Sequence, residues 1–200
     1  MKNDQYKFIF LHIPKTAGTS ISHVFYEKLL GEYFVGHPSV HYDVDITAHQ
    51  KNNYFKFSVQ RNTFDRVVSI WSYWNYRIIR DEKKIPTVSF QDFCINFHNF
   101  SEVISNYFDP LETVHFDTCH TAIKRMTNHQ LSISDIDYFI NFDDLKKGFQ
   151  NVCSKLNINC DLPHLNATER KHYREYYTPK CVDIISKRYK KDIEYFGHEF

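Results

Sequence analysis

The 200-residue chain lacks the sequence features that mark membrane, secreted and nucleic-acid-binding proteins. No stretch approaches the roughly 20 consecutive apolar residues that a membrane-spanning helix needs, so we expect no stable membrane insertion. The formal net charge of +1 gives no overall field that would attract nucleic acid. The cysteines number five and share no repeated spacing, which favours reduced thiols in a reducing compartment over a disulfide framework. The sequence therefore predicts a cytoplasmic protein that binds no nucleic acid.

Known metal-binding patterns are missing as well. The twelve histidines are scattered, without the H-E-x-x-H pattern or a paired Cys/His spacing, so we expect no metal site. Internal repeats and low-complexity tracts are absent too. The composition, 42% hydrophobic and 17% aromatic, is that of a globular protein. A chain of this length is expected to form a single domain, residues 1–200, with a sizeable core.

Apolar segments alternate with segments of helical periodicity. The strands that we predict from apolar runs and period-two patterns are residues 6–12, 55–60 and 136–142. A helix is expected after each strand, and the second should begin at Arg66 with Asp65 as its N-cap. Residues 101–135 are expected to form short helices. A final helix, preceded by Thr178 as its cap, should run from Pro179 through Phe196. This alternation predicts an α/β fold with a central, mainly parallel sheet flanked by helices.

The turn after the first strand has the composition of an anion-binding loop. Residues 12–20 place one lysine, one glycine and three hydroxyl residues where a buried strand meets a helix. The N-terminus of a helix directs unpaired N–H groups and the positive end of its dipole at an anion, most naturally a phosphate. The common nucleotide loop G-x-x-x-x-G-K-S/T does not fit, because Lys15 precedes Gly18 by three positions. The candidate ligand-binding residues are Lys15, Thr16, Ala17, Gly18, Thr19 and Ser20.

A second strand-to-helix turn, at residues 61–69, offers another set of anion-binding groups. Ligands of open α/β sheets bind beyond the carboxyl ends of the strands. If the strands that end at His12 and Gln60 are neighbours, Lys15 and Arg61 face one pocket, and Ser69 can join Arg61 at an anion. A nucleoside with phosphates at both ends would satisfy both turns. The alternative for Arg61 is a simple salt bridge with Asp65.

The two turns resemble the motifs of a known family. His12-Ile13-Pro14-Lys15-Thr16-Ala17-Gly18-Thr19-Ser20 resembles the 5′-phosphosulfate loop of carbohydrate sulfotransferases, in the branch with the pattern HIPKTxGTS. Arg61-Asn62-Thr63-Phe64-Asp65-Arg66-Val67-Val68-Ser69 resembles their 3′-phosphate motif RNPxxRxxS, with Thr63 where proline is usual. Residues 162–166, 173–177 and 192–200 are similar to bacterial members. The resemblance implies a three-layer, P-loop-like fold.

The resemblance also implies a reaction. It is the transfer of a sulfuryl group from 3′-phosphoadenosine 5′-phosphosulfate (PAPS) to a hydroxyl of a carbohydrate or glycolipid, without a metal. Lys15 would stabilise the charge that develops on the departing 5′-phosphate, which residues 16–20 would cradle. Arg61 and Ser69 would hold the 3′-phosphate. Arg170 is a further candidate for that phosphate, with a solvated basic surface as the alternative.

The acceptor hydroxyl needs a general base, for which a histidine is suited. Two histidines between the motifs are candidates: the Gly-His context favours His37, and the spacing back from Arg61 favours His41. Two other functions stay open. One is a P-loop nucleotide kinase, which would require Mg²⁺ and the G-K-S/T order. The other is a non-catalytic nucleotide-binding module of the same fold. The sequence does not indicate an oligomeric state.

Overall fold

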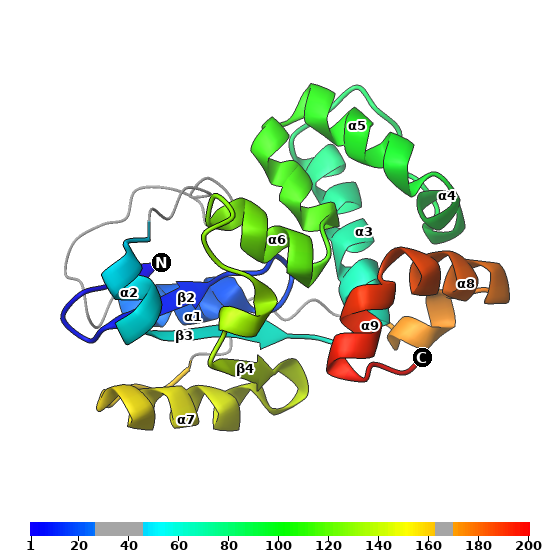
Figure 1. Ribbon diagram of the computed structural model, residues 1–200. Helices are drawn as coiled ribbons and strands as arrows, with labels where there is room; N and C mark the ends of the chain where they lie inside the picture. The colour runs from blue at the N-terminus through cyan, green and yellow to red at the C-terminus, as the bar shows by residue number, and fades with distance from the viewer. Residues whose placement is uncertain (27–45, 163–169) are drawn as a thin grey trace. The chain divides into compact units, whose positions relative to one another are not determined.

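The computed structural model describes residues 1–26, 46–162 and 170–200. The contacts within the chain divide it into two compact units (Figure 1). The sheet unit consists of the described parts of Met1–Arg61 and Cys119–Thr168. The helical unit consists of the described parts of Asn62–Thr118 and Glu169–Phe200. The expectation of one domain over residues 1–200 stays a prediction.

The sheet unit is built on four strands in the order β1-β2-β3-β4. They are β1 (Lys2–Asn3), β2 (Phe8–Leu11), β3 (Phe55–Gln60) and β4 (Tyr138–Asn141). β2 pairs in parallel with β3, and β3 in parallel with β4, whereas β1 pairs antiparallel with β2. The three predicted strands are therefore confirmed. β1 was not predicted, because a strand of two residues shows no periodicity.

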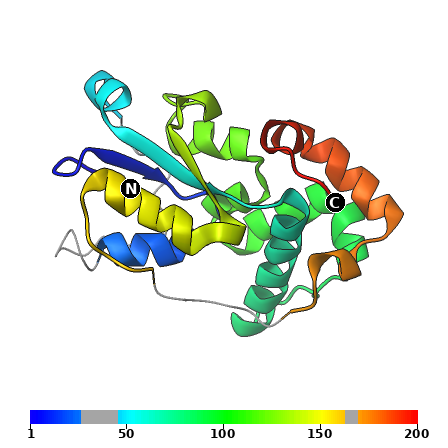
Figure 2. The same ribbon diagram turned by 90° about the horizontal axis from the view of Figure 1, so that it is seen from below.

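Helices flank this sheet. α1 (Gly18–Phe25) and α7 (Leu145–Leu156) share one buried cluster with the strands. The strand residues of this cluster are Phe8, Phe10, Phe57, Val59 and Ile140. α6 (Cys119–Met126) is drawn on the opposite side of the sheet from α7 in Figures 1 and 2. The short elements of the unit are α2 (Ala48–Asn53), η3 (Ile133–Asp135) and η4 (Phe142–Asp144). The predicted α/β class, with a mainly parallel sheet between helices, is confirmed.

The carboxyl ends of β2 and β3 lie side by side. Leu11 is the register partner of Ser58, and the Ser58 hydroxyl donates a hydrogen bond of 2.7 Å to the Leu11 carbonyl. The turn that follows Leu11 and the residue that follows Gln60 therefore start from the same edge of the sheet. The two strands are therefore neighbours, which was the condition for Lys15 and Arg61 to face one pocket.

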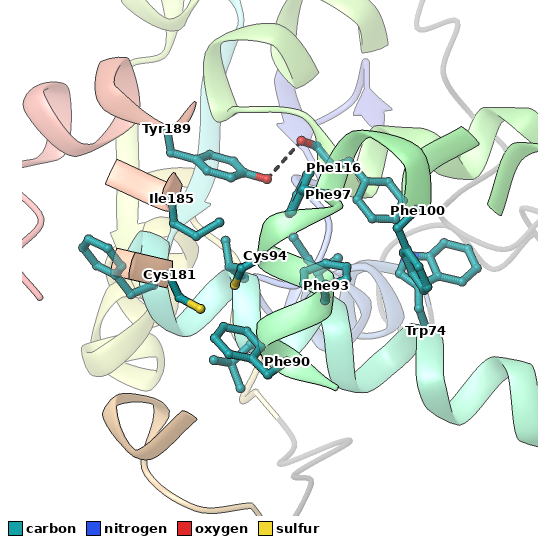
Figure 3. Close-up of a cluster of buried hydrophobic side chains, with 14 of the residues drawn as sticks. Trp74, Phe90, Phe93, Cys94, Phe97, Phe100, Phe116, Cys181, Ile185 and Tyr189 are labelled. Atoms are coloured by element: carbon teal, nitrogen blue, oxygen red, sulfur yellow. Dashed lines mark hydrogen bonds between the residues drawn. The ribbon is translucent and has the colours of Figure 1, made fainter. Parts of the chain in front are cut away.

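The helical unit packs its elements around an aromatic core. Its elements are α3 (Thr63–Arg80), α4 (Phe90–Ile95), α5 (Phe97–Tyr107), η2 (Pro110–Phe116), η5 (Tyr173–Tyr176), α8 (Pro179–Arg188) and α9 (Lys190–Phe196). Figure 3 shows Phe93, Phe97 and Phe116 within this core, which α3, α4, α5, η2 and α8 all supply. Tyr189 is fully buried there, and its hydroxyl donates a hydrogen bond of 3.0 Å to the Phe116 carbonyl.

Two predicted helix boundaries were wrong. α3 begins at Thr63, and its N-cap is Asn62, whose side-chain oxygen accepts hydrogen bonds from the N–H groups of Phe64 and Asp65. Asp65 therefore lies in the first turn rather than at the cap. The final helix is interrupted at Tyr189, which separates α8 from α9 and directs its ring into the core. The predicted cap at Thr178 is confirmed, because its hydroxyl accepts from the Cys181 N–H.

Within the described parts of the chain, no helix is both long and apolar enough to span a membrane. The cytoplasmic location stays a prediction.

Gly148 of α7 lies close against β4, and it provides a test of this packing. A Cβ atom at Gly148 would lie 2.5 Å from the Ile140 Cγ2 atom, on a buried strand. Alanine at this helical position gains about 1 kcal/mol in helix propensity, but overpacking costs about 1–3 kcal/mol. We expect Gly148→Ala to lower the free energy of unfolding, measured by urea denaturation.

The matched control is Ser154→Ala, at an exposed position of the same helix. This substitution brings the propensity gain without the clash, so it should leave stability unchanged or slightly raised. A Gly148→Ala variant that is more stable than the parent protein would contradict the close packing of α7 on β4.

Candidate functional site

The turn between β2 and α1 has a strained backbone. Lys15 has a φ of 67° and Ala17 a φ of 65°, so both adopt the left-handed conformation that residues with a Cβ atom rarely adopt. Each such residue costs on the order of 1–3 kcal/mol and persists only where its surroundings fix it. Other turns and helix ends of the chain also contain left-handed residues, but this turn has two of them, at the predicted catalytic lysine and two residues later. Backbone strain of this kind occurs often at ligand-binding sites.

Side chains from the sheet unit hold this turn in place. The Nη1 atom of Arg61 donates a hydrogen bond of 2.8 Å to the Lys15 carbonyl. The Thr16 hydroxyl donates one of 2.7 Å to the Ile13 carbonyl, and Thr16 is fully buried. The Thr16 hydroxyl is therefore engaged inside the turn, and the contact of Thr16 with a phosphate stays a prediction.

The N-terminal end of α1 presents backbone N–H groups. Ser20 and Ile21 make the first hydrogen bonds back to the Ala17 carbonyl. The N–H groups of Gly18 and Thr19 therefore precede the helical ladder and point out of the end of the helix. Together with the helix dipole, they form the kind of site that binds an anion. Thr19 is exposed and Ser20 is buried, so the Thr19 hydroxyl is the more accessible of the two.

His12 explains why position 18 must be a glycine. A Cβ atom on Gly18 would lie 1.8 Å from the His12 Cδ2 atom, so the imidazole occupies the space that any larger residue would need. The His12 ring also stacks on Phe10, with ring planes 9° apart and centroids 6.2 Å apart. Sequence reasoning gave His12 no role. Its place as the first residue of the turn was the only available signal.

Arg61, the first residue of the second predicted motif, contacts the first motif through its hydrogen bond to the Lys15 carbonyl. It is only 8% exposed, and its guanidinium lies 4.1 Å from the centroid of the Phe142 ring, which follows β4. A guanidinium has five N–H donors, and the Lys15 carbonyl takes one of them. The structure therefore confirms that Lys15 and Arg61 lie together at one edge of the sheet. The contact of Arg61 with a 3′-phosphate stays a prediction.

In the helical unit, Ser69 and Arg170 lie on the same face of α3. Arg170 forms an ion pair with Asp65, which precedes Ser69 by four residues and so lies one turn away on that face. The Arg170 Nη1 atom is buried and makes no hydrogen bond to any residue that the structure describes. Arg170 is thus held beside Asp65, about one helical turn along α3 from Ser69. Asp65 holds Arg170, and the salt bridge between Asp65 and Arg61 considered above stays a prediction.

Arg66 is a functional-motif residue to which the sequence analysis gave no role. It is 2% exposed, and its guanidinium donates to the carbonyl groups of Asp117 (2.9 Å) and His115 (3.4 Å). These bonds tie α3 to the end of η2. Arg66 therefore serves the packing of the helical unit, although its motif position alone could equally indicate a ligand contact.

The two candidate bases, His37 and His41, lie outside the described residues. In the ranges that the structure does describe, no group of three or more His, Cys, Asp and Glu side chains is arranged to hold a metal ion.

The chain is similar to a known protein family and to a solved structure. A family model described as the sulfotransferase family matches residues 1–199. A search of curated proteins gives no match. Among solved structures, a sulfotransferase from Alicyclobacillus acidocaldarius is similar, with 16% sequence identity and a TM-score of 0.43. The similarity covers 74% of this chain and 57% of the other, so the chain spans little more than half of that protein. Because the family match extends over residues 1–199, the chain belongs to the sulfotransferase family.

Proposed function

We propose that the protein transfers a sulfuryl group from PAPS to a hydroxyl of a carbohydrate or glycolipid acceptor. The observation that carries this proposal is the strained turn at Lys15, which ends at the open N-terminus of α1. In the reaction, the bond between sulfur and the bridging oxygen breaks, and a bond between sulfur and the acceptor oxygen forms. The leaving group is the 5′-phosphate of 3′,5′-ADP, on which negative charge accumulates.

Two sets of groups in the sheet unit would stabilise that charge. The N–H groups of Gly18 and Thr19 would bind the non-bridging oxygens of the 5′-phosphate. The ammonium group of Lys15 would approach the bridging oxygen, whose charge grows as the bond to sulfur breaks. Arg61 supports this role because it holds the Lys15 carbonyl and with it the left-handed turn. Binding groups that are fixed before the reaction need no reorganisation in the transition state.

The 3′-phosphate would be bound by Ser69 and Arg170, with Arg61 as the third predicted ligand. The buried Nη1 atom of Arg170 supports this assignment, because an anionic oxygen would supply the hydrogen bond that the described residues do not. The 3′-phosphate would anchor the donor and fix the direction of attack on sulfur. The acceptor would lose its proton to His37 or His41.

The first test concerns Lys15. We expect Lys15→Ala to lower the release of 3′,5′-ADP from PAPS, with a glycan acceptor, by about 10²- to 10³-fold, the loss typical of one transition-state donor. Binding of 3′,5′-ADP, measured by calorimetry, should change much less, because the amine acts chiefly on charge that develops during transfer. Lys155→Ala, an exposed lysine on α7, is the matched control. Normal turnover by Lys15→Ala would refute the proposed mechanism.

The second test distinguishes binding of the 3′-phosphate from binding of the 5′-phosphate. We expect Arg170→Ala to weaken binding of 3′,5′-ADP by about 10- to 100-fold, as for the loss of a charged hydrogen bond, and to leave the affinity for 5′-AMP nearly unchanged. The variant also removes an ion-pair partner of Asp65, so the double variant Arg170→Ala/Asp65→Asn serves as the control for the loss of that ion pair. Equal losses for both nucleotides would count against a contact with the 3′-phosphate. Binding of ATP with Mg²⁺ instead of metal-free 3′,5′-ADP would favour the nucleotide-kinase alternative.

The third test identifies the base. One of the two variants His37→Ala and His41→Ala is expected to lower turnover by about 10²- to 10⁴-fold, while its affinity for 3′,5′-ADP stays the same. The other variant should retain turnover, since a single base suffices for one hydroxyl. Full activity in both variants would exclude both histidines, and donor binding without turnover across a broad acceptor panel would favour the non-catalytic module.

A further inference from the structure

Cys153 and Cys160 form a close pair of thiols in the sheet unit. Their Sγ atoms are 3.2 Å apart, and neither cysteine is in a disulfide. Cys153 lies in the last turns of α7 and is 4% exposed, whereas Cys160 is partly exposed. The proposed donor-binding groups do not include either residue, so the pair needs an explanation of its own.

The backbone brings the two cysteines together by a defined reversal of the chain. Asn157 ends α7 in the left-handed conformation, and the Ile158 N–H donates a hydrogen bond of 2.9 Å to the Cys153 carbonyl. This is the hydrogen bond of a Schellman-type helix end, which fixes the direction in which the chain leaves the helix. Cys160 is therefore held near Cys153 by backbone geometry as well as by the sulfur contact.

In the segment after the reversal, every second residue packs against the core. Ile158, Cys160 and Leu162 are partly buried and pack against the cluster that includes Phe149 and Val152. We refer to Ile158–Leu162 as the strap. Because alternate side chains of the strap face the core, the Cys160 side chain lies toward α7. The two Sγ atoms, now 3.2 Å apart, need to move only a short way to reach the S–S bond length of about 2.05 Å.

We propose that Cys153 and Cys160 are a reversible redox site, which a small-molecule disulfide such as oxidised glutathione closes to an intramolecular disulfide. In the first step, the Cys160 thiolate attacks one sulfur of the oxidant, which forms a mixed disulfide and releases one glutathione thiolate. In the second step, Cys153 loses its proton to solvent and attacks the Cys160 sulfur, which releases the second glutathione thiolate. Two protein thiols are oxidised and one glutathione disulfide is reduced to two thiols.

Cys160 reacts before Cys153 because the two thiols have different surroundings. Cys160 is the accessible member, so an oxidant in solution reaches it first. Burial, the contact with Cys160 and the nearby Asp161 carboxylate raise the pKa of the Cys153 thiol to about 12. Cys153 is therefore a poor first nucleophile, but it is placed beside the sulfur that it must attack.

The pair also differs from the other cysteines of the chain. Cys94, Cys119 and Cys181 are in no disulfide and are nearly fully buried, so an oxidant in solution does not reach them while the protein is folded. Closure of the pair would link α7 to the strap and cross-link a short loop, which restricts the unfolded chain and stabilises the sheet unit.

The experiment treats the folded, reduced protein with oxidised glutathione and follows intact mass, peptide mapping and thermal unfolding. The parent protein should lose the mass of two hydrogens, the disulfide should map to Cys153 and Cys160, and Tm should rise by about 5 °C. Dithiothreitol should reverse all three changes. Cys160→Ser should form no disulfide, and its Tm should not respond to the oxidant.

Cys153→Ala provides the second variant, because the first step would still occur without the thiol that resolves it. We expect this variant to keep one glutathione adduct at Cys160. Retention of the adduct by the parent protein, or a disulfide that maps to another pair, would overturn the proposal. No step of the experiment measures sulfuryl transfer, so its outcome is independent of the proposed activity.

Discussion

One partly buried hydrogen bond, from the Arg61 guanidinium to the Lys15 carbonyl, fixes the conformation of the proposed catalytic turn. A lysine with a φ of 67° is unfavourable by itself, and a turn with a second left-handed residue at position 17 would relax without support. The support comes from the sheet, since parallel pairing of β2 and β3 brings both chain segments to one edge. The Phe142 ring, from the end of β4, packs on the same guanidinium and limits its movement.

This hydrogen bond gives Arg61, in the second motif, a structural role in addition to its predicted contact with the 3′-phosphate. Arg61 was expected to be a ligand of the 3′-phosphate, but one of its donors also belongs to the turn of the first motif. Substitution of Arg61 would therefore disturb the Lys15 backbone and any 3′-phosphate contact together, and the two effects would not separate. Arg170 is the more informative position, because its partner in the structure is the Asp65 carboxylate and its Nη1 donor is still available among the described residues.

Local patterns predicted the sheet well and the helix ends less well. The predicted bounds of β3 are the same as those in the structure, because its apolar and polar residues alternate without interruption. Asp65 was a poor choice of cap because Asn62, three residues earlier, offers the same chemistry at the point where α3 begins. The break at Tyr189 is invisible in the sequence, since the apolar pattern continues from α8 into α9. Only the core of the helical unit shows that the Tyr189 hydroxyl bonds to the Phe116 carbonyl.

The contacts of His12 and Arg61 account for the order of residues in the turn. The His12 ring excludes a side chain at position 18, so the first residue of α1 contributes only its backbone to the site. In the proposed function, the N–H groups would bind the phosphate, and the lysine precedes them in the turn instead of joining the helix. A cation in that position suits charge that grows on a bridging oxygen, whereas charge on the outer oxygens is already matched by the helix end. The separation of the two tasks is the physical reason to assign this turn to sulfuryl transfer.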